Sequence, residues 1–330
     1  MTMLAHEKQI QQYQKTLQQL KEQSSGHSLL TGEEIQEMEK KFEQLKTKVY
    51  SELTPWDRIG ICRHQQRPHA LDYIQNICDD YEEIKGDRSF QDDHSIVAAI
   101  AKINGEKFML IGQEKGKDTE SRLYRNFGMP HPEGYRKALR CMKLAEKFHL
   151  PIVTLLDTPG AYPGLAAEER GQGWAIAKNL LEMSRIATPI IVLIIGEGNS
   201  GGALGMGIGD VVGILEHAYY SVISPEGCAS ILWKDATKNS LAAATLKMHA
   251  EHLLELGIVD VVLPEPPGGA HLDCAFAYSQ VKRFILTQAQ DLKGYPESFL
   301  LEKRYQKFRR MGKFELTTNE ALNSSRPSQQ

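Results

Sequence analysis

Two glycine-rich stretches contain the residues of this chain that are best suited to chemistry. The longer one reads IIVLIIGEGNSGGALGMGIGD (190–210), in which six apolar, mostly β-branched residues run into a segment with almost no side chains. Glycine inside a helix costs up to about 1 kcal/mol relative to alanine, so its repetition here requires a reason. Gly201 and Gly202 lie where a helix should begin, and the unpaired amides of such a turn can hold an oxyanion at a thioester or amide carbonyl.

A four-residue spacing of glycines continues beyond that turn. Gly201, Gly205 and Gly209 would lie on one face of an α-helix and would leave that face bare. Close helix packing is a sufficient explanation for Gly205 and Gly209. Two adjacent glycines at the start of the helix are harder to explain by packing alone, which favours a binding role for Gly201 and Gly202.

The second stretch has the same architecture one unit earlier in the chain. A buried strand within PIVTLLDTPGAYPG (151–164) runs into a turn at 157–161 and then into a helix. The carboxyl ends of neighbouring parallel strands meet at one edge of a sheet, where α/β proteins bind their ligands. We therefore expect the two bare turns to form one ligand crevice.

A serine in the longer stretch offers a different chemistry. Residues 198–202 match G-x-S-x-G, the nucleophile elbow of serine hydrolases, and Ser200 would be the nucleophile. A triad needs an acid and then a histidine downstream, and Asp260 and His271 follow in that order. The alternative is that Ser200 is only the small residue that a crowded turn permits.

The elements that must position these turns follow from hydrophobic periodicity. Residues 4–23 and 32–53 each have one apolar stripe and predict a helical hairpin, with Thr31 and Glu34 as the capping box of its second helix. This hairpin is expected to pack against the main domain or another subunit. From residue 95 onward, strands alternate with helices, which predicts a largely parallel sheet. The expected elements are a strand hairpin around Asn104-Gly105, helices at 132–148, 166–187 and 238–256, and strands within 151–164, 190–195, 219–227 and 258–266.

Bulk composition excludes several classes of protein. The 330 residues are 41% hydrophobic and 25% charged with a net charge of −3, which indicates a globular protein and gives no reason to expect nucleic acid or an anionic membrane as partner. No apolar run approaches the ~18 residues that span a bilayer, and no signal-peptide core is present, so we expect a cytoplasmic protein. The five cysteines form no CxxC pair, so no zinc ribbon is expected.

Longer segments of the chain resemble a known family. They occur in the family's order and cover most of the chain: RPHALDYI, GDRSFQDD, NFGMPHPEGYRKALR, DTPGAYPGLAAEERGQ, GEGNSGGALGMGIGD, SVISPEGCASILWK and PEPPGGAH. The chain thereby resembles the carboxyltransferase α subunits of bacterial and plastid acetyl-CoA carboxylase. The resemblance implies an α/β crotonase-like (ClpP/crotonase) fold of repeated ββα units. Its expected parts are an N-terminal helical hairpin (1–56), a carboxyltransferase domain (57–316) and a disordered tail (317–330).

The same resemblance implies an activity. Members of this family transfer a carboxyl group from carboxybiotin, held on a separate biotin carboxyl carrier protein, to acetyl-CoA, which gives malonyl-CoA for fatty-acid biosynthesis. The expected assembly is an α₂β₂ heterotetramer with a β subunit, and zinc is expected in the β subunit only. ATP is expected to be used by a separate biotin carboxylase component.

Site residues are assigned by resemblance as well. Gly201 and Gly202 are the expected catalytic oxyanion hole, facing biotin rather than the acyl group, and the biotin anion itself would serve as the base. Further substrate or biotin contacts are expected at Gly160, Ala161, Gly198, Lys115, Arg136 and Arg170. The three basic residues are equally consistent with solvated charges. A further alternative is that the α subunit is a scaffold and the β subunit carries all of the chemistry.

Overall fold

The structure is a computed structural model that describes residues 7–24 and 32–312. Its centre is one mixed sheet with the strand order β1-β2-β3-β4-β5-β6-β8, in which β7 also pairs with β5. The strands are β1 (Asp80–Glu83), β2 (Ile96–Ile103), β3 (Glu106–Gln113), β4 (Ile152–Thr158), β5 (Ile190–Asn199), β6 (Val211–Leu215), β7 (Tyr219–Ser221) and β8 (Val261–Leu263). All pairings from β3 to β8 are parallel, as predicted, while β1, β2 and β3 pair antiparallel.

The predicted strand hairpin is confirmed at β2 and β3. Ile103 pairs with Glu106, so the turn consists of Asn104 and Gly105, with φ of 50° and 79°. Positive φ at both central residues is the geometry that matches the twist of the flanking strands. The Asn-Gly pair therefore sets the register of β3, which ends at Gln113 and is followed by Lys115 two residues later.

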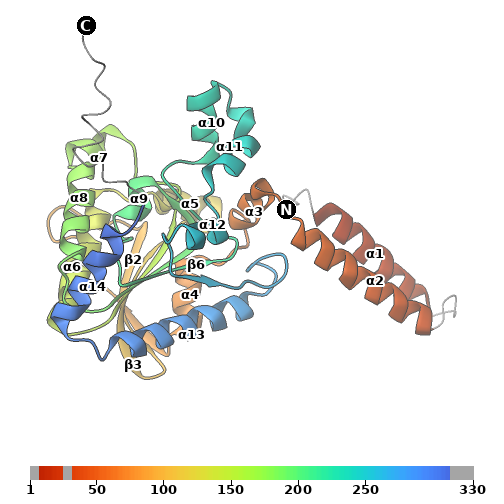
Figure 1. Ribbon diagram of the computed structural model, residues 1–330, viewed down its shortest axis with the longest axis horizontal. Helices are drawn as coiled ribbons and strands as arrows, with labels where there is room; N and C mark the ends of the chain where they lie inside the picture. Colours follow the sequence, from red (N-terminus) through yellow and green to blue (C-terminus); the bar gives the residue numbers. More distant parts are fainter. Residues whose placement is uncertain (1–6, 25–31, 313–330) are drawn as a thin grey trace, which may run out of the picture.

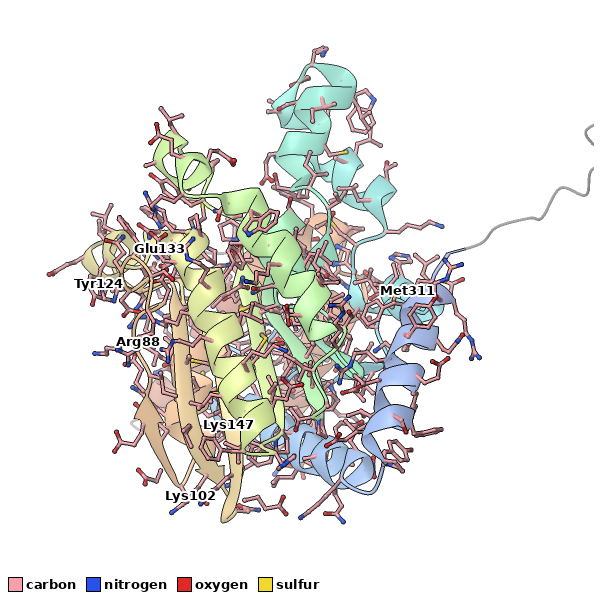
Figure 2. All side chains as sticks on the ribbon, turned by 90° about the vertical axis from the view of Figure 1, so that its left-hand side faces the viewer. Arg88, Lys102, Tyr124, Glu133, Lys147 and Met311 are labelled. Atoms are coloured by element: carbon pink, nitrogen blue, oxygen red, sulfur yellow. The ribbon has the colours of Figure 1, made fainter. Side chains whose placement is uncertain are left out.

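Helices cover both faces of the sheet (Figure 1). Those of the main body are α3 (Pro55–Cys62), α4 (Ala70–Ile77), α5 (Thr119–Tyr124), α6 (Pro132–Lys147), α7 (Leu165–Glu169), α8 (Gln172–Met183), α9 (Ser200–Leu204), α10 (Pro225–Trp233), α11 (Asn239–Leu246), α12 (Ala250–Glu255), α13 (Cys274–Leu292) and α14 (Glu297–Arg309). Two short 3₁₀ segments occur at Asn126–Gly128 and Ala236–Lys238. Helix α6 packs on one face together with α8, and α4 and α13 pack on the other. Figure 2 shows Glu133 and Lys147 near opposite ends of α6.

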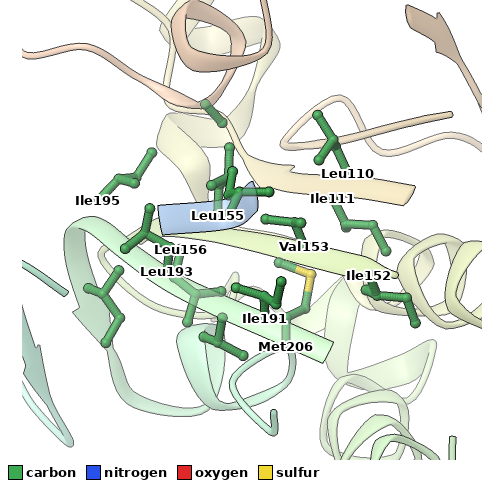
Figure 3. Packing of buried hydrophobic residues seen from close by; sticks show 14 of the residues in the cluster. Leu110, Ile111, Ile152, Val153, Leu155, Leu156, Ile191, Leu193, Ile195 and Met206 are labelled. Carbon is green, nitrogen blue, oxygen red and sulfur yellow. The ribbon is translucent and has the colours of Figure 1, made fainter. Parts of the chain in front are cut away.

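The core lies between these helices and the central strands. Every residue of β4 and β5 is buried, as expected for parallel strands that are covered on both faces. Figure 3 shows the packing of their side chains, including Val153, Leu155, Ile191 and Leu193, with Met206 from the segment after α9. The strands that precede the two glycine turns are thus buried along their whole length.

Three expectations about helices are wrong in detail. The helix expected at 166–187 is two helices, α7 and α8, because Gly171 adopts a left-handed conformation with φ of 82° between them. The helix expected at 238–256 is likewise interrupted at Lys247, which has φ of 48°. Helix α9 ends at Leu204, so Gly209 is not on its face and instead lies against the Ile190 carbonyl.

The two N-terminal helices form the predicted hairpin and project from the main body (Figure 1). They are α1 (Glu7–Ser24) and α2 (Gly32–Ser51), held together by stacking of Tyr13 on Phe42 at 5.8 Å. A His271 ring nitrogen lies 3.6 Å from the Glu7 carboxylate at the base of the hairpin. The hairpin thus meets the main domain at its base, as one of the two expected partners. The capping box predicted at Thr31 and the tail predicted at 317–330 lie outside the described residues.

No helix in the described ranges 7–24 and 32–312 has the length and apolar character that a membrane span requires.

Candidate active site

The two glycine turns lie side by side at the carboxyl edge of the sheet. Strands β4 and β5 are parallel neighbours, and Thr158 at the end of β4 pairs with Gly198 near the end of β5. The turn at 159–161 and the first turn of α9 therefore emerge next to each other. This is the crevice position expected for a ligand in an α/β sheet.

The backbones of the two turns touch, and only one of the two adjacent glycines is required for it. A β-carbon on Gly202 would lie 2.4 Å from the Gly160 carbonyl carbon and 2.6 Å from the Ala161 nitrogen, distances that no side chain tolerates. A β-carbon on Gly201 would meet its nearest neighbour, Ile176, at 3.4 Å, which is ordinary contact. Gly202 is thus required by close approach of backbone, whereas Gly201 is not.

The amides of this crevice differ in what they bind. The Gly160 amide donates to the Thr158 hydroxyl at 3.1 Å, and this hydroxyl donates back to the Gly160 carbonyl at 2.8 Å. The Gly160 amide is therefore engaged within its own turn. Gly201 and Gly202 lie in the first turn of α9, where the amides of an α-helix have no acceptor inside the helix.

A residue that the sequence analysis did not consider joins the two turns. Gln113, at the end of β3, is fully buried. Its side-chain nitrogen donates to the Gly202 carbonyl at 2.7 Å, and its side-chain oxygen accepts from the Asp157 amide at 3.1 Å. The Tyr135 hydroxyl, on α6, also donates to the Gly202 carbonyl at 3.2 Å.

A buried ion cluster lies directly below the turns. The Lys115 ammonium contacts Asp157 at 2.6 Å and Glu197 at 2.7 Å. Burial lowers the pKa of Lys115, but the two carboxylates outweigh it, so the pKa lies above its usual value. Gly196 makes room for this arrangement, because a β-carbon there would lie 2.3 Å from the Asp157 carboxylate.

Glu197 connects this cluster to elements on the far side of β5. Its carboxylate accepts from Arg63, the residue that follows α3, at 2.8 Å and from the Tyr219 hydroxyl of β7 at 2.5 Å. Burial raises the pKa of Glu197, but the positive charges of Lys115 and Arg63 have the larger effect and lower the pKa to about 2. Arg63 also binds Glu226 of α10 at 2.6 Å, so ion pairs connect the end of β5 through Arg63 to α10.

The other two predicted basic contacts converge on a different carboxylate. Arg170 binds buried Glu133 at 2.7 Å, and Arg136 binds Asp87 at 2.7 Å and Glu133 at 3.4 Å. Burial raises the pKa of Glu133, but hydrogen bonds, the largest from Arg170, outweigh it and hold the pKa below its usual value. Glu133 lies at the start of α6 (Figure 2). Lys115, Arg136 and Arg170 are therefore each ion-paired, while Arg136 and Arg170 remain partly exposed. Their role as substrate contacts stays a prediction.

A cavity of about 240 Å³ adjoins the crevice on the side of the ion cluster. It is lined by Cys62, Arg63, His64, His69, Lys115, Arg122, Phe127, Asp157, Pro159 and Glu197. The lining is strongly charged, and it includes Lys115 and the residue before Gly160. The cavity thus joins one predicted contact, Lys115, to the turn after β4.

The hydrolase triad is not assembled. Ser200 is exposed and has φ of 52°, but its proposed partners are engaged elsewhere. The Asp260 carboxylate accepts from the Val212 amide and from Lys307. The His271 ring stacks on His64 at 3.8 Å, at the base of the hairpin. This separation removes the geometric basis for a serine nucleophile.

Comparison with known proteins defines the class. The profile of the family described as acetyl co-enzyme A carboxylase carboxyltransferase-like matches residues 3–312. The acetyl-coenzyme A carboxylase carboxyl transferase subunit alpha of Protochlamydia amoebophila is 63% identical over 95% of this chain and 99% of its own length. The protein of that name from Chlamydia pneumoniae is 60% identical over 96% of this chain and 98% of its own.

Solved structures agree on the fold. The transcarboxylase 12S structure aligns with a TM-score of 0.56 and 21% identity over 69% of this chain and 42% of that one. The β subunit of Pseudomonas aeruginosa geranyl-CoA carboxylase aligns with a TM-score of 0.54 and 16% identity over 74% of this chain and 46% of that one. The fold is thus the crotonase-like fold of carboxyltransferases, as predicted. The chain belongs to the acetyl-CoA carboxylase carboxyltransferase family, and the serine hydrolase alternative is not supported.

Proposed function

We propose that this chain is the α subunit of the carboxyltransferase component of a multi-subunit acetyl-CoA carboxylase. It takes part in the transfer of a carboxyl group from carboxybiotin, carried on a biotin carboxyl carrier protein, to acetyl-CoA, which gives malonyl-CoA. The observation that carries this proposal is the 63% identity over nearly the whole chain to a relative of that name.

The bare amides of α9 suit the electrostatic demand of this reaction. When carboxybiotin gives up its carboxyl group, negative charge is left on the ureido oxygen of biotin. Gly201 and Gly202 lie in the first turn of a helix, where free amides and the positive end of the helix dipole favour an anion. Neither Gly201 nor Gly202 adds a side chain to the crevice, which suits the approach of a flat ureido group.

Basic side chains would contribute less directly. Lys115, Arg136 and Arg170 are proposed to lie near the substrate anions, but each already has a carboxylate partner. A direct contact would therefore require each side chain to share its donors between a protein carboxylate and a substrate. Gly198 offers only backbone, and a β-carbon there would lie 2.9 Å from the Tyr220 ring and 3.0 Å from the Tyr219 carbonyl oxygen.

Exposed apolar side chains on both sides of α9 support a partner subunit. Leu165 and Trp174 of the α7–α8 segment are 75% and 77% exposed, and Ile231 and Leu232 of α10 are 62% exposed. Figure 1 shows these segments at the same end of the molecule as α9. Large exposed apolar groups of this kind mark interaction surfaces. We propose that a zinc-containing β subunit covers this end in an α₂β₂ assembly, with the carrier protein and an ATP-dependent biotin carboxylase as further components.

The decisive experiment is the reverse reaction, the malonyl-CoA-dependent carboxylation of free biocytin. It is run with this chain alone and with a co-expressed zinc-ribbon β subunit. We expect activity only with the β subunit, because the proposed active site then includes residues of both subunits. A stable complex that shows no carboxylation of biocytin would overturn the proposed function.

A further inference from the structure

Gln113 uses both ends of one side-chain amide to join the two glycine turns. Its oxygen accepts from the backbone amide of Asp157, at the end of β4, and its nitrogen donates to the carbonyl of Gly202, in the first turn of α9. The side chain is fully buried. Water therefore has no access to replace either bond.

The chemistry of the bridge is specific to an amide of this length. One bond needs an acceptor and the other a donor, and the side-chain amide of Gln is among the few groups that offer both at once. Asn carries the same group but is one methylene shorter, so it cannot reach both backbone partners from the end of β3. The bridge thus fixes the distance between the two turns from a third strand.

We propose that Gln113 is a positioning residue for carboxyl transfer. It holds the Gly202 carbonyl, and with it the first turn of α9, at a fixed place relative to the turn at 160–161, and thereby positions the free amides of Gly201 and Gly202 in that turn. This inference rests on the proposed function of those two amides. Gln113 itself touches no substrate, since its polar atoms are both bound to backbone.

A positioning role predicts a specific kinetic signature. Gln113→Met keeps nearly the same length and volume but removes both bonds, so the Gly202 carbonyl keeps only the Tyr135 hydroxyl. In the biocytin assay with the β partner, we expect kcat to fall roughly 10- to 100-fold, as small misplacements of reacting groups do. The KM for biocytin should stay within about twofold of the wild-type value, because ground-state contacts are retained. Gln113→Asn should show the same pattern.

Thr188→Val is the matched control. Thr188 is also buried, and its hydroxyl donates to the Leu150 carbonyl at 3.0 Å, but it lies before β5, at the opposite edge of the sheet. The variant removes one buried side-chain-to-backbone bond at constant shape. We expect it to lower the thermal midpoint and to leave kcat unchanged.

The outcomes separate the two proposals. An inactive wild-type complex would refute the proposed function. An active wild type with unchanged kcat in both Gln113 variants would refute the positioning role, as would a loss confined to KM or an equal loss of kcat in Thr188→Val. Failure of both Gln113 variants to assemble, while Thr188→Val assembles normally, would assign Gln113 to folding and likewise overturn the inference.

Discussion

At the scale of single residues, the two adjacent glycines of α9 have different reasons to be glycine. The neighbour of Gly202 is the backbone of the turn at 160–161, which cannot move away without disturbing β4. The neighbour of Gly201 is the end of the flexible Ile176 side chain. Both amides are proposed to bind the same anion. A substitution at Gly202 therefore changes the shape of the crevice, whereas a substitution at Gly201 leaves both the shape and the amides in place.

Gly202→Ala should abolish most of the activity while Gly201→Ala should not. The added methyl of Gly202→Ala collides with backbone and displaces the crevice, so we expect a loss of ~10²-fold or more in kcat for the biocytin reaction. Gly201→Ala keeps its amide, has room for the methyl group, and should gain up to about 1 kcal/mol in unfolding free energy from helix propensity.

The same pair of variants tests the alternative that the α subunit is only a scaffold. Each variant is assembled with the β subunit, and assembly is checked by gel filtration before kinetics. If Gly202→Ala assembles and turns over at the wild-type rate, the crevice has no catalytic part and the scaffold alternative is correct.

At the scale of elements, the carboxyl edge of the sheet is supported by a layer of helices that includes a buried histidine. His249 precedes α12, and its backbone forms an isolated antiparallel β-bridge with Tyr219 of β7. Tyr219 also lies in a small apolar cluster with Ile59 and Met248, which joins α3 to this layer. Because Tyr219 binds Glu197, the layer is linked to the ion cluster below the glycine turns.

Acid should weaken this layer through His249. Burial, and then the charge of Arg58, lower the pKa of His249 from 6.5 to about 4. Between pH 6.5 and 4, His249 is protonated in the unfolded chain but stays neutral in the folded chain. The free energy of unfolding therefore has its full value above pH 6.5 and decreases as the pH falls toward 4. The loss should reach about 3 kcal/mol at pH 4.

His249→Gln removes this titration. Urea unfolding of both proteins at several pH values between 7 and 4 gives the difference in their unfolding free energies. That difference should shift in favour of the variant as the pH falls. A difference that is independent of pH would show that His249 titrates normally in the folded protein.

At the scale of the whole molecule, the N-terminal hairpin projects from the main body (Figure 1). Helices α1 and α2 pack on each other, and the hairpin reaches the body near His271 and Gly268. Thr54 is the N-cap of helix α3, and its hydroxyl forms a capping box with Asp57. The domain boundary predicted near residue 56 therefore falls within the first turn of α3.

A chain that starts at residue 53 should fold without the hairpin. It keeps the Thr54 cap, and we expect a cooperative thermal transition within about 5 °C of that of the full chain, since few contacts cross the boundary. A chain that starts at Trp56 loses the cap and should be less stable by about 1 kcal/mol. Loss of cooperative unfolding in the longer truncation would show that the hairpin is part of the main fold. The measurement is circular dichroism during heating.

Local pattern determined much of this protein. The Asn104-Gly105 turn, the fully buried strands β4 and β5 and the position of both glycine turns depend on neighbours in the chain, and the long family segments indicated the class. Tertiary structure decided the rest. Gln113 and Gly202 are 89 residues apart, and the ion cluster joins residues of β4 and β5 with Arg63 after α3 and Lys115 after β3. Hydrogen bonds and ion pairs act over a few ångströms in space, so no periodicity in the chain could have shown which glycine faces backbone or which carboxylate each basic side chain binds.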